Sequence, residues 1–229
     1  RDLLIELLKH YEVAIISGSR FEIFEVNVIQ PLHEVKHELL EHLHILPTCG
    51  TRYYTYDSEI KTWDIIYAED FSEKDKAHII EVAERIARES GLWPSHPHGD
   101  VIEDRLSQIA VSMLGQKAPA EEKYEWYAKH GEDAIRLKDK IAAALPGFEV
   151  RNGGATTIDI TPIGVDKAYG MQKLIDRLGI TKEEVLFIGD RLEEGGNDYP
   201  VKAMGVDTID VDGWQSTPHV VRGILGVTE

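Results

Sequence analysis

The chain has 229 residues, of which 42% are apolar and 8% aromatic. That is enough to bury one good core, or a core with a smaller companion domain. Forty-one acidic against twenty-five basic residues give a formal charge of -16, a field that repels nucleic acid and anionic lipid. An anionic ligand would therefore need a local group of cations or a bound metal ion.

The cysteine content and the hydropathy pattern predict a protein of the cytoplasm. Cys49 is the single cysteine, so no disulfide forms within the chain, and this usage fits a reducing compartment. No apolar run approaches the length of a membrane span, and the first residues lack the pattern of an export leader. We therefore expect neither a membrane nor a nucleic-acid partner.

The first third of the chain predicts alternating helices and strands. Leu3–His10 has the pattern of the end of an amphipathic helix. Val13–Ile16 is a short apolar run stopped by Ser-Gly-Ser, which is typical of a strand buried on both faces of a parallel sheet. Residues 21–40 are helical in part, residues 44–50 predict a second strand and turn, and residues 52–67 alternate as a hairpin.

The pattern changes near Asp70 and predicts an inserted α+β domain at residues 69–162. A helix ends at Gly91, and its apolar face is expected to hold Ala77, Ile80, Ala83, Ile86 and Ala87. Val101–Leu114 is strand-like, residues 121–145 are helical, and residues 148–162 form two strands about a glycine turn.

The last third returns to alternating helices and strands. Residues 166–178 predict a helix with Gly179 as its stop, and residues 183–190 predict a buried strand. A short helix, another strand and a closing helix follow. Residues 1–68 and 163–229 are thus expected to form one doubly wound parallel α/β core.

Three polar residues occupy positions where such sheets bind ligands, beyond the carboxyl ends of strands and at helix N-termini. Ser17 follows the first strand, Asp190 follows the strand of residues 185–188, and Lys167 opens a helix. Lys167 opposes the positive end of the helix dipole, at a cost of up to about 1 kcal/mol. It is either a surface lysine neutralised by Asp166 or a lysine held there to meet phosphate.

The loop after Asp190 suits a divalent cation. Hard oxygen ligands at a strand end are typical of Mg²⁺, which binds one or two carboxylates plus phosphate, and glycines allow close approach of the backbone. The loop carries Gly195, Gly196, Asn197 and Asp198. Asp190 can equally be a turn acid, Asp198 can equally cap the next helix, and Ser17, Gly18 and Ser19 can equally be a plain turn. The ten histidines lack zinc-like spacing.

These residues, in this order, resemble motifs two, three and four of the haloacid dehalogenase (HAD) superfamily. The segments "GDRLEEGGND", "IEDRLSQIAVSMLGQ" and "GGATTIDITPIGVDK" are most similar to the phosphomannomutase and sugar-phosphate phosphatase branch, whose inserted α+β domain is a cap. The resemblance implies a Rossmann-like core and a Mg²⁺-dependent phosphoryl transfer. It also implies a possible homodimer through the cap.

The resemblance further implies a role for each matching residue. Ser17 would hydrogen-bond the transferring phosphate, Lys167 would steady it, and Asp190 would bind Mg²⁺ with support from Asn197 and Asp198. The residues expected to bind substrate are Gly18, Ser19, Arg20, Arg105, Lys123 and Asp159.

Three departures from the family pattern bear on activity. The first motif, a central strand ending in an Asp-x-Asp nucleophile, has no counterpart in these residues, and we expect it upstream of Arg1. Gln116 and Lys123 stand where mutases of this type carry arginines, which grip a second phosphate with a planar fork. Arg20 and the pair Thr48-Cys49 also differ from the mutase pattern.

The sequence therefore favours a Mg²⁺-dependent phosphatase of a phosphorylated sugar, acting through an aspartyl-phosphate. A phosphomannomutase that interconverts mannose 6-phosphate and mannose 1-phosphate is the first alternative. A catalytically silent sugar-phosphate-binding module is the second. The identity of the sugar is left open by the sequence.

Overall fold

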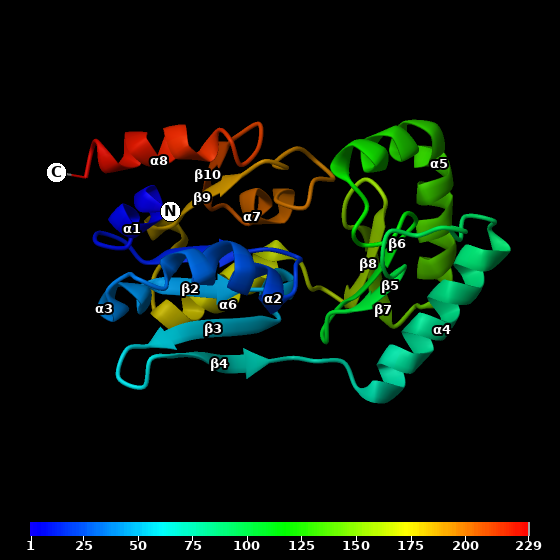
Figure 1. Ribbon diagram of the computed structural model, residues 1–229, viewed down its shortest axis with the longest axis horizontal. Helices are drawn as coiled ribbons and strands as arrows, with labels where there is room; N and C mark the ends of the chain where they lie inside the picture. The colour runs from blue at the N-terminus through cyan, green and yellow to red at the C-terminus, as the bar shows by residue number, and fades with distance from the viewer. Residues whose placement is uncertain (229) are drawn as a thin grey trace. The chain divides into compact units, whose positions relative to one another are not determined.

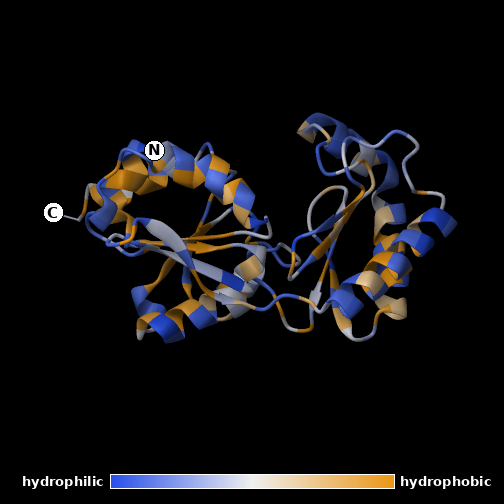
Figure 2. Ribbon diagram, turned by 60° about the horizontal axis from the view of Figure 1, so that its bottom comes forward, coloured by the Kyte–Doolittle hydropathy of each residue, from blue (hydrophilic) through white to orange (hydrophobic). Residues whose placement is uncertain are grey.

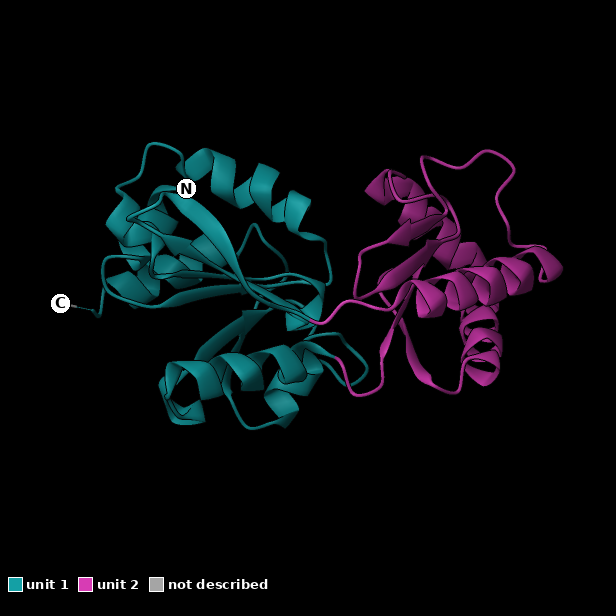
Figure 3. Ribbon diagram, turned by 90° about the horizontal axis from the view of Figure 1, so that it is seen from below, with its two compact units in different colours: residues 1–68, 166–229 teal, residues 69–165 magenta. Residues whose placement is uncertain are grey.

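The computed structural model describes residues 1–228 and divides into two compact units (Figure 3). Unit 1 comprises Arg1–Ala68 and the segment from Asp166 to the end of the chain, and unit 2 comprises Glu69–Val165. The inserted domain predicted from the sequence covers residues 69–162.

Unit 1 contains a four-stranded sheet in the order β1-β2-β3-β4 (Figure 1). The strands are β1 (Val13–Ile16), β2 (Leu43–Leu46), β3 (Arg52–Asp57) and β4 (Thr62–Ala68). β1 and β2 are parallel, with Val13 opposite Leu43, and β3 and β4 form an antiparallel hairpin. Parallel β1 and β2 carry Ser17 and the segment after Leu46 to the same edge of the sheet.

A second, two-stranded parallel sheet in unit 1 pairs β9 (Leu186–Gly189) with β10 (Asp207–Asp210). Helices lie on both sides of the strands of unit 1 (Figure 2), as in doubly wound folds. The helices are α1 (Asp2–Leu7), α2 (Phe21–Phe24), α3 (His37–Leu40), α6 (Lys167–Leu178), α7 (Tyr199–Ala203) and α8 (Thr217–Leu225). Shorter helical turns are η1 (Glu25–Ile29), η2 (Gln30–Leu32), η3 (Thr48–Gly50) and η4 (Lys182–Glu184).

Helix α6 has the start and stop signals expected from its sequence. The Asp166 side chain accepts a hydrogen bond from the Tyr169 amide at 3.0 Å, and Gly179 ends the helix in the left-handed conformation at φ 67°. The buried face of the helix is formed by Gly170, Met171, Leu174 and Ile175. These contacts fix Lys167 as the first helical residue.

β1 and β9 each end a separate sheet, although they share an apolar cluster. Ile16 of β1 packs against the cluster that contains Phe187 of β9 and Met171 of α6. Among the described residues no ladder pairs β1 with β9. Ala14 and Leu186 are exposed even though helices cover both sides of these strands. A parallel strand between β1 and β9 would pair the backbone edge that each of them leaves open and join the two sheets.

Unit 2 packs two helices on one face of an antiparallel sheet in the order β5-β6-β8-β7 (Figure 1). The elements are α4 (Glu73–Glu89), β5 (Ile102–Asp104), β6 (Ile109–Ser112), α5 (Ala120–Ala144), β7 (Phe148–Asn152) and β8 (Thr157–Pro162). The core includes Ile79, Ile109, Ile141 and Ile160, all 0% exposed. Strand alternation therefore turns the row Glu103, Ala110, Asp159 and Arg151 to the opposite face.

Two details of unit 2 differ from what the sequence predicts. Residues 101–114 form two strands rather than one, because a tight turn with Leu106 at φ 72° separates β5 from β6. The buried face of α4 contains Ile79 and Val82, whereas Ala77 is exposed. Ile79 and Ile80 are adjacent, so the sequence alone did not indicate which of two helix faces is buried. In the structure the face that contains Ile79 packs against the core.

None of the helices in the described part of the chain is both long and apolar enough to cross a membrane.

Candidate active site

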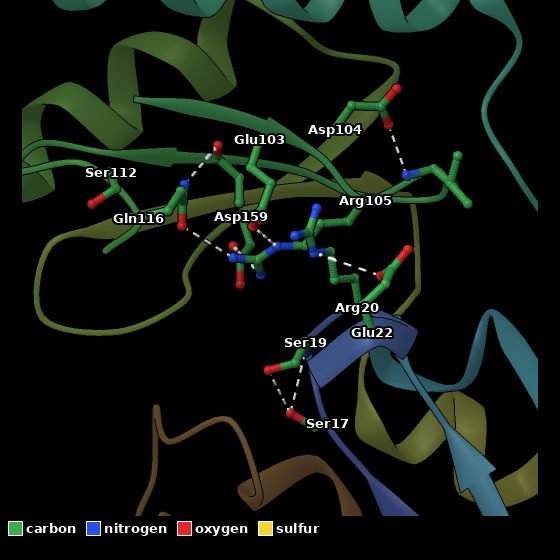
Figure 4. A network of polar contacts seen from close by, with 12 residues as sticks. Ser17, Ser19, Arg20, Glu22, Glu103, Asp104, Arg105, Ser112, Gln116 and Asp159 are labelled. Atoms are coloured by element: carbon green, nitrogen blue, oxygen red, sulfur yellow. Dashed lines mark hydrogen bonds and ion pairs between the residues drawn. The ribbon is translucent and has the colours of Figure 1, made fainter. Parts of the chain in front are cut away.

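The first part of the site is the loop that follows β1. The Ser17 amide continues the ladder by donating to the Leu46 carbonyl at 3.2 Å. The Ser17 hydroxyl accepts from the Ser19 amide at 3.2 Å and donates to the Ser19 hydroxyl at 3.3 Å (Figure 4). Ser17, Gly18 and Ser19 are half-buried, and Arg20 is exposed with Glu22 at 3.5 Å. The loop thus places two hydroxyls at the carboxyl end of β1, where a phosphoryl oxygen can be bound.

Lys167 is paired with Asp198, a residue 31 positions away. Its ammonium donates to Asp198 Oδ1 at 2.5 Å, and the two side chains are 13% and 2% exposed. Asp166 instead caps the helix through the Tyr169 amide. The lysine is therefore held by a buried carboxylate, and the alternative of a surface lysine neutralised by Asp166 does not describe this arrangement.

Asp198 also organises the loop after β9. Its Oδ2 accepts from the backbone amides of Asp190 and Arg191 at 3.1 and 3.2 Å. Its side chain forms no capping bond to α7, although that was the alternative left open by the sequence. Both carboxylate oxygens therefore have protein partners, and Asp198 positions Lys167 and Asp190. Its support of a metal site stays a prediction.

The chain's own packing requires glycine at the end of β9 and at Gly196, whereas nothing lies within 4 Å of the place that a Cβ on Gly195 would take. A Cβ on Gly196 would lie 2.1 Å from the Arg191 carbonyl oxygen, and a Cβ on Gly189 would lie 2.8 Å from Asp198 Oδ2. Gly195 adopts φ 87°. The sequence suggested that the Gly195-Gly196 pair allows close approach of a ligand, but at Gly196 the close neighbour is Arg191.

The side chains present fit Mg²⁺ through one carboxylate. Asp190 is exposed and follows β9 directly. Asn197 is further along the same loop and is exposed as well. Within residues 1–228, no group of three or more histidine, cysteine or acidic side chains is arranged to hold a metal ion. Mg²⁺ keeps several waters and binds one or two carboxylates together with phosphate oxygens. The exposed Asp190 carboxylate is compatible with such a partly filled coordination shell.

Unit 2 contains a separate polar cluster around Arg105 (Figure 4). Arg105 donates to Glu103 at 2.6 Å and to Gln116 Oε1 at 3.2 Å, and it lies 3.8 Å from Asp159. Asp159 Oδ1 is buried without a hydrogen-bond partner. Burial raises the pKa of the Asp159 carboxyl to about 6, against the attraction of Arg105. Asp159 Oδ1 is thus a buried acceptor that the described residues leave unsatisfied.

Gln116 and Lys123 are both tied to the protein around this cluster. Gln116 Nε2 donates to the Ala110 carbonyl at 3.2 Å, while Gln116 Oε1 receives Arg105. Lys123 Nζ donates to the Gln116 carbonyl at 3.4 Å. Gln116 is neutral and holds Arg105 in place, and Lys123 is a point charge. The two positions thus lack the pair of guanidinium forks expected of a mutase cap.

Comparison with known proteins identifies the family. A model of the eukaryotic phosphomannomutase family matches residues 1–222. The chain belongs to this family. The phosphomannomutase of Saccharomyces cerevisiae is 34% identical over 107 residues, which is 45% of this chain and 41% of that protein. That of Arabidopsis thaliana is 33% identical over 109 residues, which is 45% of this chain and 42% of that protein. The matched segments thus span about two fifths of these relatives.

Solved structures confirm the HAD fold. An IMP-bound mutant of the Plasmodium falciparum IMP-nucleotidase aligns with a TM-score of 0.66 at 19% identity, covering 99% of this chain and 62% of that one. A haloacid dehalogenase-like hydrolase from Bacteroides thetaiotaomicron aligns with a TM-score of 0.59 at 15% identity, covering 97% and 90%. The predicted Rossmann-like α/β core and the resemblance to the phosphomannomutase branch are both confirmed.

The roles of Ser17, Lys167 and Asp190 stay predictions, and the sequence did not indicate that Asp198 connects Lys167 with the Asp190 amide. The pairing of Lys167 with Asp198 joins the third and fourth motifs across 31 residues, and no local pattern encodes such a contact. Gln108 was also missed. It is 1% exposed, its amide has no hydrogen-bond partner, and it lies in the turn before β6. A polar residue opening an apolar strand was the available signal.

Proposed function

We propose that the protein is a Mg²⁺-dependent phosphoryl-transfer enzyme that acts on a phosphorylated sugar, with hydrolysis as the favoured reaction. The observation that carries this proposal is the Lys167–Asp198 pair. The Asp198 carboxylate also accepts a hydrogen bond from the Asp190 amide. One buried side chain therefore positions both the Lys167 ammonium and the candidate metal ligand Asp190. Membership of the phosphomannomutase family supports a phosphosugar substrate.

Each candidate site residue of unit 1 has a proposed role in this reaction. The Ser17 hydroxyl donates to a phosphoryl oxygen, and Lys167 neutralises developing negative charge beside it. Asp190 holds Mg²⁺, which supplies further charge neutralisation when bound, and Asn197 supports it. Phosphoryl transfer depends mainly on positioning and electrostatic stabilisation. A net charge of -16 makes such local cations necessary for an anionic substrate.

The nucleophile has a place in the sheet topology. A parallel strand between β1 and β9 would carry its last residue to the edge that holds Ser17 and Asp190. We place the Asp-x-Asp nucleophile expected from the family on such a strand. Attack of its carboxylate on phosphorus would form an aspartyl-phosphate and break the bond to the sugar oxygen, which would take a proton from the second aspartate of the motif. Water would then hydrolyse the aspartyl-phosphate to inorganic phosphate.

Unit 2 is proposed to act as the cap that binds the sugar. Arg105 and Asp159 offer a donor and an acceptor to sugar hydroxyls. Gln116 is engaged with Arg105 and a backbone carbonyl, which supports hydrolysis, because a mutase must also seat a second phosphate. A homodimer through unit 2 and a cytoplasmic location stay predictions.

Phosphomannomutase activity is the second candidate, and the family match favours it. The deciding experiment incubates the full-length protein and Mg²⁺ with mannose 6-phosphate or mannose 1-phosphate, with and without a hexose bisphosphate activator. Stoichiometric release of phosphate without isomerisation is expected. Isomerisation that depends on the bisphosphate, with little free phosphate, would contradict hydrolysis. Binding with neither reaction would support the silent module.

A further inference from the structure

The segment after β2 has three consecutive residues in the left-handed region. Thr48, Cys49 and Gly50 adopt φ of 48, 58 and 83°. Left-handed backbone is strained for residues with a Cβ, and most of all for a β-branched residue such as Thr48. Such strain persists only where the surroundings over-determine the conformation, and it concentrates at functional sites. We call Thr48–Gly50 the left-handed turn.

The left-handed turn is hydrogen-bonded to the serine loop. The Thr48 amide donates to the Ser19 carbonyl at 3.0 Å, and the Cys49 amide donates to the Ser17 carbonyl at 2.9 Å. The two bonds attach the turn to both ends of the serine loop, residues 17–19. The conformation of the turn therefore fixes the backbone of the two serines.

Thr51 locks the left-handed turn from within. Its hydroxyl donates to the Thr48 carbonyl at 2.8 Å and lies 2.6 Å from the Thr48 hydroxyl. Thr48 and Thr51 are 1% and 0% exposed. The Thr51 amide also donates to the Thr48 carbonyl, at 3.3 Å. The amide and the hydroxyl of Thr51 thus together hold the strained conformation in place.

The same turn is in close contact with the lysine-bearing helix. A Cβ on Gly50 would lie 2.4 Å from Gly170 Cα, and a Cβ on Gly170 would lie 2.4 Å from the Cys49 carbonyl oxygen and 2.7 Å from Ile16 Cδ1. Gly170 is in the first turn of α6, three residues after Lys167. Glycine inside a helix is unfavourable, and here it permits contact of the helix with the turn at backbone distance.

We propose that the left-handed turn, Thr51 and Gly170 form a positioning element that sets the serine loop and Lys167 at a fixed separation. The turn bonds the loop on one side and contacts the lysine helix on the other. This inference rests on the proposed function for its catalytic consequence. Its geometric content, the placement of Lys167 beside Asp198, stands apart from that function.

The perturbation is Gly170→Ala in the full-length protein, with Gly179→Ala as the matched control. An alanine at 170 forces a displacement of about 1 Å, because the 2.4 Å contact must lengthen to an ordinary 3.4 Å. Gly179 lies at the other end of α6, is left-handed at φ 67°, and has nothing within 4 Å of the place that a Cβ would take. The control therefore strains the same helix without the contact.

Two readouts separate positioning from a merely structural effect. We expect Gly170→Ala to lower kcat by about 10²-fold with a smaller change in KM, and Gly179→Ala to leave both within a few-fold. Acetylation of Lys167, measured by mass spectrometry relative to Lys138, should accelerate at least several-fold in Gly170→Ala only. The proposal would be overturned if Gly170→Ala and Gly179→Ala had the same kcat and the same rate of Lys167 acetylation.

A second pair of variants covers the case in which Gly170→Ala does not fold. Thr51→Val removes the hydroxyl in the same volume and should lower kcat and expose Lys167 to acetylation, whereas Thr51→Ser should restore both. A loss in Thr51→Val confined to thermal stability would contradict the positioning role. If the wild type shows no phosphatase or mutase turnover, the proposed function fails, and the acetylation rates still test the positioning element.

Discussion

Lys167→Met should destabilise unit 1 far more than its single lost hydrogen bond implies. The change leaves Asp198, 2% exposed, as a buried carboxylate with only the amides of Asp190 and Arg191 as partners. Removing one partner of a buried ion pair typically costs 3–5 kcal/mol. Because the lysine side chain is 13% exposed, we expect the lower end of this range, about 3 kcal/mol. Methionine retains the apolar stem of the lysine.

The measurement is native-state hydrogen exchange by mass spectrometry, which reports local opening free energies. Peptides from α6 and β9 are followed for Lys167→Met in unit 1, and peptides from α5 are followed for the control in unit 2. Arg136→Met is the control, since its pair with Asp133 has the same 2.5 Å separation but lies on the surface of α5. The control should be nearly silent. Two outcomes would refute the reasoning that burial makes the Lys167–Asp198 pair strongly stabilising. One is an equal loss of opening free energy in the two variants, and the other is an unchanged opening free energy in Lys167→Met.

Three further predictions concern pH and the core. Burial raises the pKa of Asp159 from 3.8 to about 6, so the stability of unit 2 should fall by about 3 kcal/mol as pH rises from about 4 through 6. Urea unfolding of Asp159→Asn should lack this fall. Burial lowers the pKa of His44, against its bond to Glu12, so unit 1 should lose stability as pH drops below 6.5. His44→Gln should remove that loss from its melting temperature. Ile141→Ala, at a 0% exposed position, should cost unit 2 about 2–5 kcal/mol in urea; a smaller cost would mean the core collapses around the gap.

The elements that the sequence predicted well are those specified by local rules. The Asp166 cap, the Gly179 stop and the β3–β4 hairpin are each determined by neighbouring residues, and the structure has all three. The sequence also placed Ser17 and Asp190 at carboxyl ends of strands, because apolar runs stopped by polar residues locate such ends without tertiary information.

The elements that the sequence could not supply depend on contacts between distant segments. Nothing local indicates that Asp198 takes Lys167 as its partner, or that Gly50 meets Gly170 across 120 positions. Gly170 did carry a signal, since a glycine in the first turn of a helix needs a reason. The phase of α4 failed for another cause: apolar residues at 79 and 80 satisfy two helical faces equally, and only packing decides between them.

The central claim is that a divalent cation at Asp190 recruits phosphate to the edge of unit 1. Isothermal titration of the full-length protein with inorganic phosphate, in Mg²⁺ and in EDTA, tests it directly and requires no turnover. We predict that Mg²⁺ strengthens phosphate binding at least tenfold in the wild type and has no effect in Asp190→Asn. Circular dichroism should show that the fold of Asp190→Asn is unchanged. Equal enhancement by Mg²⁺ in Asp190→Asn would contradict the claim.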